Sequence, residues 1–143
     1  MARLSLTRRL HFSAAHRYRR PEWDDARNLA TFGKCARPQY HGHTYIVDVT
    51  VSGPLDDTTG FVVDLGLLDR LLASEVIEPL DHANLNLDVA EFAEGRRIPS
   101  SEELARWIAE RVNAGLAHTS ARVQRVVVAE EPNLWATWTE DDA

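Results

Sequence analysis

Several features that would assign this sequence to a special class of protein are missing from it. It has a single cysteine, Cys35, so no internal disulfide can form and a reducing compartment is indicated. It has no apolar run of membrane-spanning length, and its first residues lack the long apolar stretch of a signal peptide. We therefore expect a cytoplasmic protein that has no membrane partner.

An excess of positive charge is also missing. The chain has 16 Lys and Arg against 22 Asp and Glu, a formal net charge of −6, whereas broad nucleic-acid binding requires a basic face. We expect no nucleic-acid partner. Basic residues nonetheless gather between positions 17 and 37, either as a basic mouth for an anionic substrate or as a solvated loop with scattered arginines. They are Arg17, Arg19, Arg20, Arg27, Lys34 and Arg37.

No internal repeat, low-complexity tract or linker divides the chain. Its 143 residues, 44% of them hydrophobic, are enough for one domain with a real hydrophobic core. We therefore expect a single domain over residues 1–143.

Alternation of apolar and polar residues predicts the strands. It is clear at residues 4–16 and 40–52, and two shorter strands follow at about 122–129 and 134–139. The polar stretch 17–39 between the first two strands is predicted to be a long irregular loop, the kind of loop that often carries function.

Helical spacing of leucines predicts a helix from about residue 65 to 80, capped by Asp64. A second helix begins at Ser100, where Glu103 three residues later completes a capping-box pattern. The predicted order is strand, strand, helix, helix, strand, strand. The simplest α+β solution packs the two helices on one face of a four-stranded antiparallel sheet.

Three histidines are placed to bind one metal ion. His41 and His43 are two apart at the start of a predicted strand, so their side chains share a face. In an antiparallel hairpin, His16 at the end of the first strand comes opposite this pair. Three imidazoles without a fourth protein ligand are typical of catalytic zinc. The pair alone could be a solvated strand end, but His16 favours Zn²⁺. His11, on the opposite parity, and His118 are expected to be structural or surface residues.

Other groups that could take part in chemistry have two interpretations each. Asp81 and His82 could form a proton-transfer pair, or an ordinary turn at a helix end, which the residues alone favour. Glu130 could receive paired donors from a flat nitrogenous ring, or be a charge at a strand end. Cys35 lies in a polar loop, although a lone cysteine is more often a small buried residue.

Five short motifs contain these candidate residues. They are Phe12-Ser13-Ala14-Ala15-His16, Phe32-Gly33-Lys34-Cys35, His41-Gly42-His43-x-Tyr45, Leu80-Asp81-His82-x-Asn84-Leu85 and Val128-x-Glu130. In order and spacing, over nearly the whole chain, they resemble the 6-pyruvoyltetrahydropterin synthase family, which includes the bacterial 6-carboxytetrahydropterin synthases.

The resemblance implies a tunnelling fold (T-fold), assembly of two trimers into a homohexamer, and a site at the subunit interface. It also implies roles for individual residues. These are zinc ligation by His16, His41 and His43, general-base catalysis by Cys35, proton relay by Asp81 and His82, anchoring of a pterin by Glu130, and lining of its pocket by Ser100 and Ser101.

The implied reaction is elimination of triphosphate from 7,8-dihydroneopterin triphosphate, followed by tautomerisation of the side chain. Lys34 and the metal are expected to lower the pKa of Cys35. Five residues separate Cys35 from His41, a spacing that favours the pyruvoyl enzymes. The carboxy enzymes of deazapurine and queuosine synthesis, which release acetaldehyde, are the alternative. A non-catalytic pterin- or purine-binding module stays open, whereas the histidines speak against a metal-free dihydroneopterin aldolase-like protein.

Overall fold

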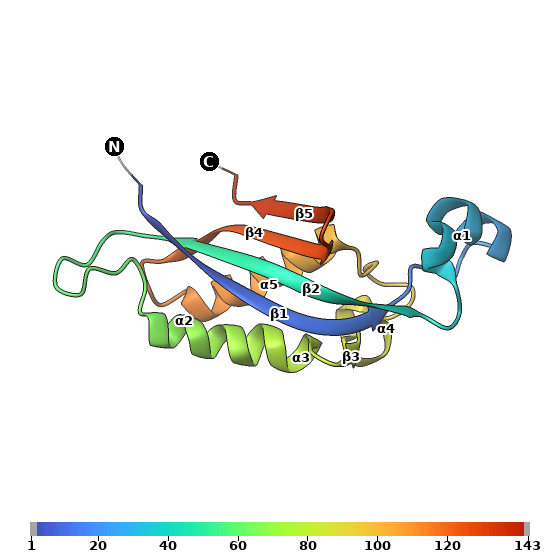
Figure 1. Ribbon diagram of the computed structural model, residues 1–143, viewed down its shortest axis with the longest axis horizontal. Coiled ribbons are helices and arrows are strands. Elements are labelled where there is room, and N and C mark those ends of the chain that lie inside the picture. Colours follow the sequence, from blue (N-terminus) through green and yellow to red (C-terminus); the bar gives the residue numbers. More distant parts are fainter. Residues whose placement is uncertain (1–2, 142–143) are drawn as a thin grey trace.

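The computed structural model describes residues 3–141, so the first two and last two positions of the expected domain lie outside the described residues. The chain folds into one sheet with its longer helices on one face (Figure 1). The strand order is β3-β1-β2-β4-β5. The strands are β1 (Ser5–His16), β2 (His41–Ser52), β3 (Ala83–Asn84), β4 (Arg122–Glu131) and β5 (Leu134–Thr139).

The predicted strands are confirmed, with ends that differ by one or two residues. β1 and β2 form a continuous antiparallel hairpin, and β4 and β5 extend the same antiparallel sheet beyond β2. The apolar parity of each strand is buried against the helices, as the alternation predicts. The buried side chains on this face include Phe12, Tyr45, Val47, Val49, Val123, Val126 and Val128.

Two helical segments cover the inner face of the sheet. The first is continuous and consists of α2 (Leu65–Leu72), a π-helical turn η2 (Ala73–Ile77) and α3 (Glu78–Leu80). The second is α5 (Ser101–Leu116). Both predicted helices are therefore confirmed. None of the helices among the described residues is both long enough and apolar enough to cross a membrane.

Local hydrogen bonds set the starts of these helices. The Asp64 carboxylate accepts from the N–H of Gly66 at 2.9 Å, and the Ser100 hydroxyl accepts from the N–H of Glu103 at 3.2 Å. The side chain of Glu103 instead pairs with Arg106, so the predicted capping box is formed on one side only. α5 also packs closely on α2, because a Cβ on Gly115 would lie 2.4 Å from a methyl carbon of Leu71.

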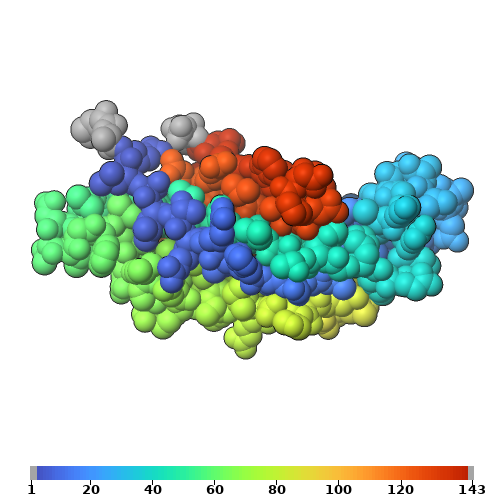
Figure 2. Space-filling view, viewed as in Figure 1, coloured from blue at the N-terminus to red at the C-terminus, as the bar shows by residue number. Residues whose placement is uncertain are grey.

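The prediction of an irregular loop over residues 17–39 is wrong. This stretch contains α1 (Asp25–Phe32) and the short 3₁₀ helix η1 (Gly33–Ala36). Asp24 caps α1 by accepting from the N–H of Arg27 at 2.7 Å, and Gly33 ends it with a φ of +61°, which favours glycine. α1 projects from one end of the molecule (Figures 1 and 2), so it buries no apolar stripe that periodicity could detect.

The sheet also has one strand more than the predicted four. β3 is two residues long and pairs in parallel with Ala14 and Ala15 of β1. Two short helices, α4 (Leu85–Asp88) and η3 (Ala90–Phe92), follow it. Elements this short contain too few residues to show a period, which explains why sequence patterns miss them.

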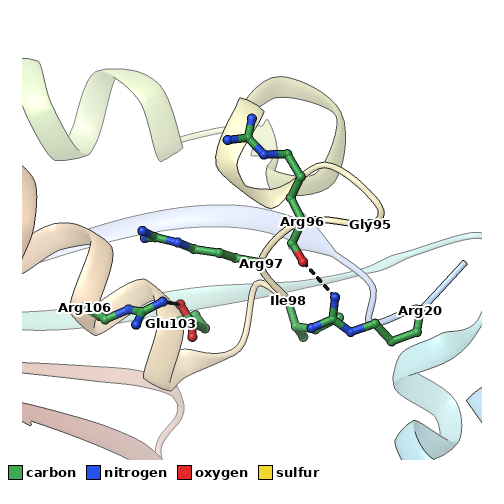
Figure 3. A pocket seen from close by; sticks show the side chains of 7 residues that line it. All are labelled: Arg20, Gly95, Arg96, Arg97, Ile98, Glu103 and Arg106. Carbon is green, nitrogen blue, oxygen red and sulfur yellow. Dashed lines mark hydrogen bonds and ion pairs between the residues drawn. The ribbon is translucent and has the colours of Figure 1, made fainter. Parts of the chain in front are cut away.

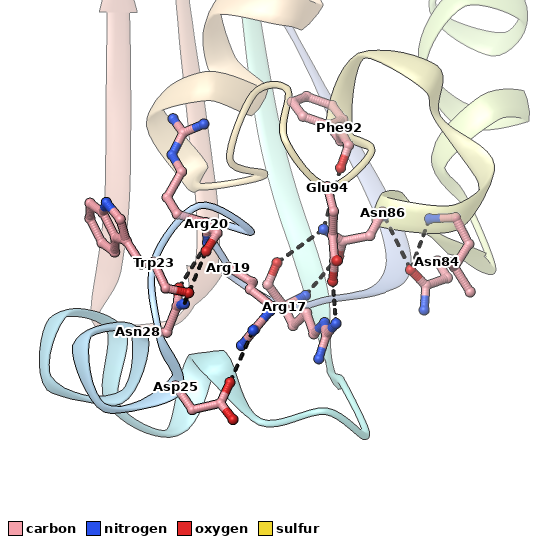
Figure 4. Close-up of polar contacts among 11 residues, drawn as sticks. Arg17, Arg19, Arg20, Trp23, Asp25, Asn28, Asn84, Asn86, Phe92 and Glu94 are labelled. Carbon is pink, nitrogen blue, oxygen red and sulfur yellow. Dashed lines mark hydrogen bonds and ion pairs between the residues drawn. The ribbon is translucent and has the colours of Figure 1, made fainter.

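Two buried asparagines fix the backbone that follows β1 (Figure 4). The Asn86 amide accepts from the N–H of Arg17 at 2.8 Å and donates to its carbonyl at 3.1 Å. The Asn28 amide does the same for Arg20, at 2.8 and 3.0 Å. These bonds satisfy backbone groups that no strand partner reaches. The path from β1 to α1 is therefore set by side chains.

We predict that Asn86→Ala lowers the free energy of unfolding by roughly 2–4 kcal/mol, because both backbone groups of Arg17 lose their partner in a buried place. Chemical denaturation followed by circular dichroism measures the change. Asn133→Ala, at an exposed position of the β4–β5 turn, serves as the control and should stay within about 0.5 kcal/mol of the wild type. Equal effects of the two variants would contradict this assignment.

Candidate active site

The hairpin brings the three predicted histidines together. His16 is paired with His41 in the β1–β2 register, and His43 is opposite Ala14. One ring nitrogen from each histidine lies within 4.8 Å of the others, and the ring centroids are 4.6 to 5.1 Å apart. The expected juxtaposition is confirmed. We call these residues the histidine cluster.

Hydrogen bonds indicate which nitrogen of His16 faces the centre of the cluster. Its Nδ1 lies 2.8 Å from the carbonyl of Pro99 and therefore carries the proton that it donates there. Its Nε2 is buried and has no partner among the described residues. An unpartnered buried acceptor is costly, and a metal ion is a group that would satisfy it. The donor set therefore fits a metal.

Burial favours the neutral, metal-binding form of His16 and of His41. Burial lowers the pKa of His16 to about 3, although its bond to Pro99 acts in the opposite direction. Burial, followed by the neighbouring charge of His43, also lowers the pKa of His41. Protons therefore compete weakly with a metal ion for these two ligands near neutral pH.

Tyr18 is a site residue that sequence patterns did not identify. Its ring lies 4.9 Å from the ring of His16 and 6.5 Å from that of His41. Its hydroxyl donates to the carboxylate of Glu130 at 3.4 Å, and its N–H donates to the carbonyl of Cys35 at 2.8 Å. Burial, reinforced by Glu130, raises its pKa, so the hydroxyl stays a donor. The sequence does contain an indication of this role, because Tyr18 comes two residues after His16 and so continues the alternation that places His16 on the buried face.

Cys35 lies half-buried in η1, in the same region as Glu130. Burial raises the pKa of its thiol, and the carboxylates of Glu130 and Glu131 raise it further. Lys34 is exposed and does not offset these effects. Lys34 therefore does not lower this pKa in the chain alone, and the lowering expected from the metal stays a prediction. The charge of Glu130 also reaches His41, so Cys35, Glu130 and the histidine cluster form one electrostatic unit.

Asp81 and His82 lie elsewhere, on the edge of β1. The Asp81 carboxylate accepts from the N–H of Ser13 at 3.0 Å and lies 3.0 Å from Nδ1 of His82. These contacts, the Ser13 bond foremost, lower its pKa. The side chain of His82 is 83% exposed, and its φ of +59° is strained for a residue with a Cβ. Within the described part of the chain, no hydrogen bond or ion pair joins this pair to Cys35 or the histidine cluster.

The two predicted serines differ in availability. The hydroxyl of Ser100 caps α5. That of Ser101 is buried, and nothing in the described chain bonds to it, so it is free to meet a ligand. They are the first and second residues after Pro99, the partner of His16. His11 and His118 are exposed, in keeping with the surface role expected for them.

Three of the six basic residues in the 17–37 segment contact a carboxylate or an aromatic ring. Arg17 pairs with Glu94, Arg19 pairs with Asp25 at 2.9 Å, and the guanidinium of Arg27 lies 4.0 Å from the centre of the Trp23 ring (Figure 4 shows the first two pairs). Arg20 is different, because its side chain is bonded to the backbone carbonyl of Arg96 at 3.0 Å and to no carboxylate of the described chain.

Comparison with known proteins supports the resemblance seen in the sequence. A family profile described as 6-pyruvoyl tetrahydropterin synthase matches residues 5–141. The 6-pyruvoyl tetrahydrobiopterin synthase of Homo sapiens is 42% identical over 103 residues, which are 72% of this chain and 70% of the human protein. The 6-carboxy-5,6,7,8-tetrahydropterin synthase of Bacillus subtilis is 31% identical over 93% of this chain and 83% of that protein.

Two further matches bear on activity and fold. The dihydroneopterin monophosphate aldolase of Pyrococcus furiosus is 31% identical over 76% of this chain and 74% of that protein. The solved structure of 6-pyruvoyl tetrahydropterin synthase from Caenorhabditis elegans superimposes with a TM-score of 0.89 at 33% identity, covering 99% of this chain and 98% of the other. The predicted α+β T-fold is thus confirmed.

We predict that His41→Ala abolishes stoichiometric zinc binding, because two imidazoles do not form a catalytic zinc site. Metal analysis of the purified protein should give about one zinc per wild-type chain and less than about a tenth of that for the variant. His11→Ala, an exposed histidine on the same hairpin, is the control and should keep its zinc. Retention of zinc by His41→Ala would refute this ligand set.

The low pKa of His16 predicts an acid-sensitive fold once metal is removed. Its folded pKa of about 3 lies below the unfolded value of 6.5, so the unfolded chain binds more protons and stability falls as pH drops below 6.5. Between pH 7 and pH 5 the loss is about 2 kcal/mol. Denaturation of chelator-treated protein at both values measures it. His16→Gln should lose this component, and an unchanged pH dependence would contradict the assignment.

Proposed function

Because the chain belongs to the 6-pyruvoyl tetrahydropterin synthase family, we propose that it is a zinc-dependent lyase that converts 7,8-dihydroneopterin triphosphate into 6-pyruvoyltetrahydropterin in the cytoplasm. The observation that carries the proposal is the histidine cluster, with the buried free nitrogen of His16, beside Cys35 and Glu130. The high identity to relatives named 6-pyruvoyl tetrahydrobiopterin synthase supports this choice of product.

Glu130, Tyr18 and Ser101 would bind the pterin. The Glu130 carboxylate would accept paired hydrogen bonds from the aminopyrimidine edge, and the hydroxyl of Tyr18 would hold that carboxylate in place. Ser101 would contribute its unpartnered hydroxyl to the same pocket, while Ser100 keeps α5 capped. The pterin would then present its side chain to the histidine cluster.

Zinc held by His16, His41 and His43 would act as a Lewis acid on a side-chain hydroxyl and make the neighbouring carbon-bound proton more acidic. Cys35 would accept that proton as its thiolate, and the electron pair left behind would break the carbon–oxygen bond to triphosphate. In the chain alone the pKa of Cys35 is raised, so the thiolate depends on positive charge that arrives with the loaded site.

Asp81 and His82 would return a proton as the side chain tautomerises. Within one chain they are not in contact with Cys35, and His82 is exposed. We propose that they serve the site of a neighbouring subunit, in a homohexamer built as two stacked trimers. The exposed position and strained backbone of His82 are in keeping with a role that a second subunit completes.

The alternative product is 6-carboxytetrahydropterin, formed with release of acetaldehyde. The relative from Bacillus subtilis favours it, whereas the five residues between Cys35 and His41 favour the pyruvoyl product. The relative from Pyrococcus furiosus is named an aldolase, so similarity to this family does not by itself exclude cleavage of the side chain.

We predict that Cys35→Ala lowers kcat on 7,8-dihydroneopterin triphosphate by about 10²- to 10⁴-fold while zinc content stays at the wild-type level. Single-turnover assays coupled to a downstream reductase measure the pyruvoyl product, and acetaldehyde detection reports the carboxy branch. Lys34→Ala, a neighbouring exposed residue, is the control and should retain near-normal kcat.

Wild-type turnover by Cys35→Ala would refute the base assignment, and absence of any turnover by the wild type would refute the proposed function. His82→Ala should also be inactive. Co-refolding the two variants together should recover a fraction of the activity if Cys35 and His82 of different subunits share a site. Failure to recover activity would contradict the shared site.

A further inference from the structure

An arginine-rich pocket is lined by residues that lie close in the chain to His16 and to Pro99. It has a volume of about 550 Å³, and its lining includes Arg20, Arg96, Arg97, Arg106 and Glu103 (Figure 3). Four guanidinium-bearing residues against one carboxylate give this surface a positive charge in a chain whose net charge is −6. We call it the arginine pocket.

The arginine side chains of this pocket make only weak contacts with other groups of the protein. The guanidinium of Arg20 donates to the carbonyl of Arg96, and the side chain of Arg96 turns away to the carbonyl of Ala90 (Figure 3 shows the first bond). Arg106 pairs with Glu103 at 2.8 Å, and Arg97 pairs with Glu110 at 3.3 Å. Both pairs are partly exposed, so they are weak and can exchange for a stronger anion.

Two residues that line the pocket lie close in the chain to His16 and to its hydrogen-bond partner Pro99. Arg20 is four residues after His16, a separation of at most about 14 Å along the chain, and its backbone is clamped by Asn28. On the other wall, Ile98 directly precedes Pro99, whose carbonyl accepts from His16. A molecule that reaches the cluster with one end therefore has a preformed cationic surface within reach of its other end.

We propose that the arginine pocket binds the phosphate chain of the substrate, with Arg20 as the leading donor. This assignment rests on the proposed function for the identity of the substrate. Arg97 and Arg106 exchange their carboxylate partners for phosphate oxygens, which planar guanidinium groups bind through paired hydrogen bonds. The arginines bind the phosphate chain equally well in the bound substrate and in the transition state. Their loss therefore raises KM more than it lowers kcat.

Inorganic tripolyphosphate tests the pocket without any turnover. Calorimetric titration of the zinc-loaded wild type should show binding, which Arg20→Gln and Arg97→Gln each weaken by about tenfold or more, because each removes a charge-assisted bond. Glu103→Gln should tighten binding several-fold, because it removes the competing carboxylate. Arg70→Gln, an exposed arginine on α2, is the matched control and should bind as the wild type does.

Tripolyphosphate could also bind at zinc, so the titration is repeated on His41→Ala. Binding that persists there and still depends on Arg20 supports the pocket. Binding that is lost with His41, or that is indifferent to Arg20 and Glu103, overturns it.

Assays with 7,8-dihydroneopterin triphosphate separate this proposal from the function on which it rests. Arg20→Gln should raise KM by about tenfold with kcat nearly unchanged. An active wild type whose KM is unaffected by Arg20→Gln overturns the pocket and leaves the function standing. Arginine-dependent tripolyphosphate binding by a wild type that does not convert this substrate overturns the function and leaves an anion site.

Discussion

The hydrogen bond from the buried imidazole of His16 to the carbonyl of Pro99 joins the end of β1 to the segment that starts α5. It fixes the tautomer of His16, so the other ring nitrogen is left to face His41 and His43. It also ties His16 to the segment that contains Ser101 and part of the lining of the arginine pocket. Much of the arrangement of the site therefore depends on this one contact.

Two asparagine side chains fix the backbone after β1, where the chain has no strand partner. Asn86 holds Arg17 and Asn28 holds Arg20 through both of their backbone groups. Tyr18 lies between the two residues held in this way, and its side chain contacts His16 and Glu130. The motif at residues 80–85 thus has a structural part, since Asn84 caps α4, while Asp81 and His82 remain available at the edge of the sheet. Asn86, directly after the motif, holds the backbone of Arg17.

The long strands and helices were predictable because each shows its own periodicity. β1, β2 and α5 each bury one face, and alternation or helical spacing records that burial in the residue order. The same parity placed His16 opposite the His41–His43 pair. α1 was not predictable in this way, because it projects from the body and its only buried side chain is that of Asn28. β3 was missed because two residues cannot show a period.

The sequence by itself determined the class of fold and the three histidines, since both follow from which side chains share a strand face. The tertiary structure decided how the remaining groups are used. It placed the half-buried Cys35 near two carboxylates, which raise the pKa of its thiol in the chain alone, and it paired Arg17 and Arg19 while leaving Arg20 without a carboxylate. These properties arise from contacts between residues far apart in the chain, and no local pattern of residues encodes the dielectric or the charges that those contacts create.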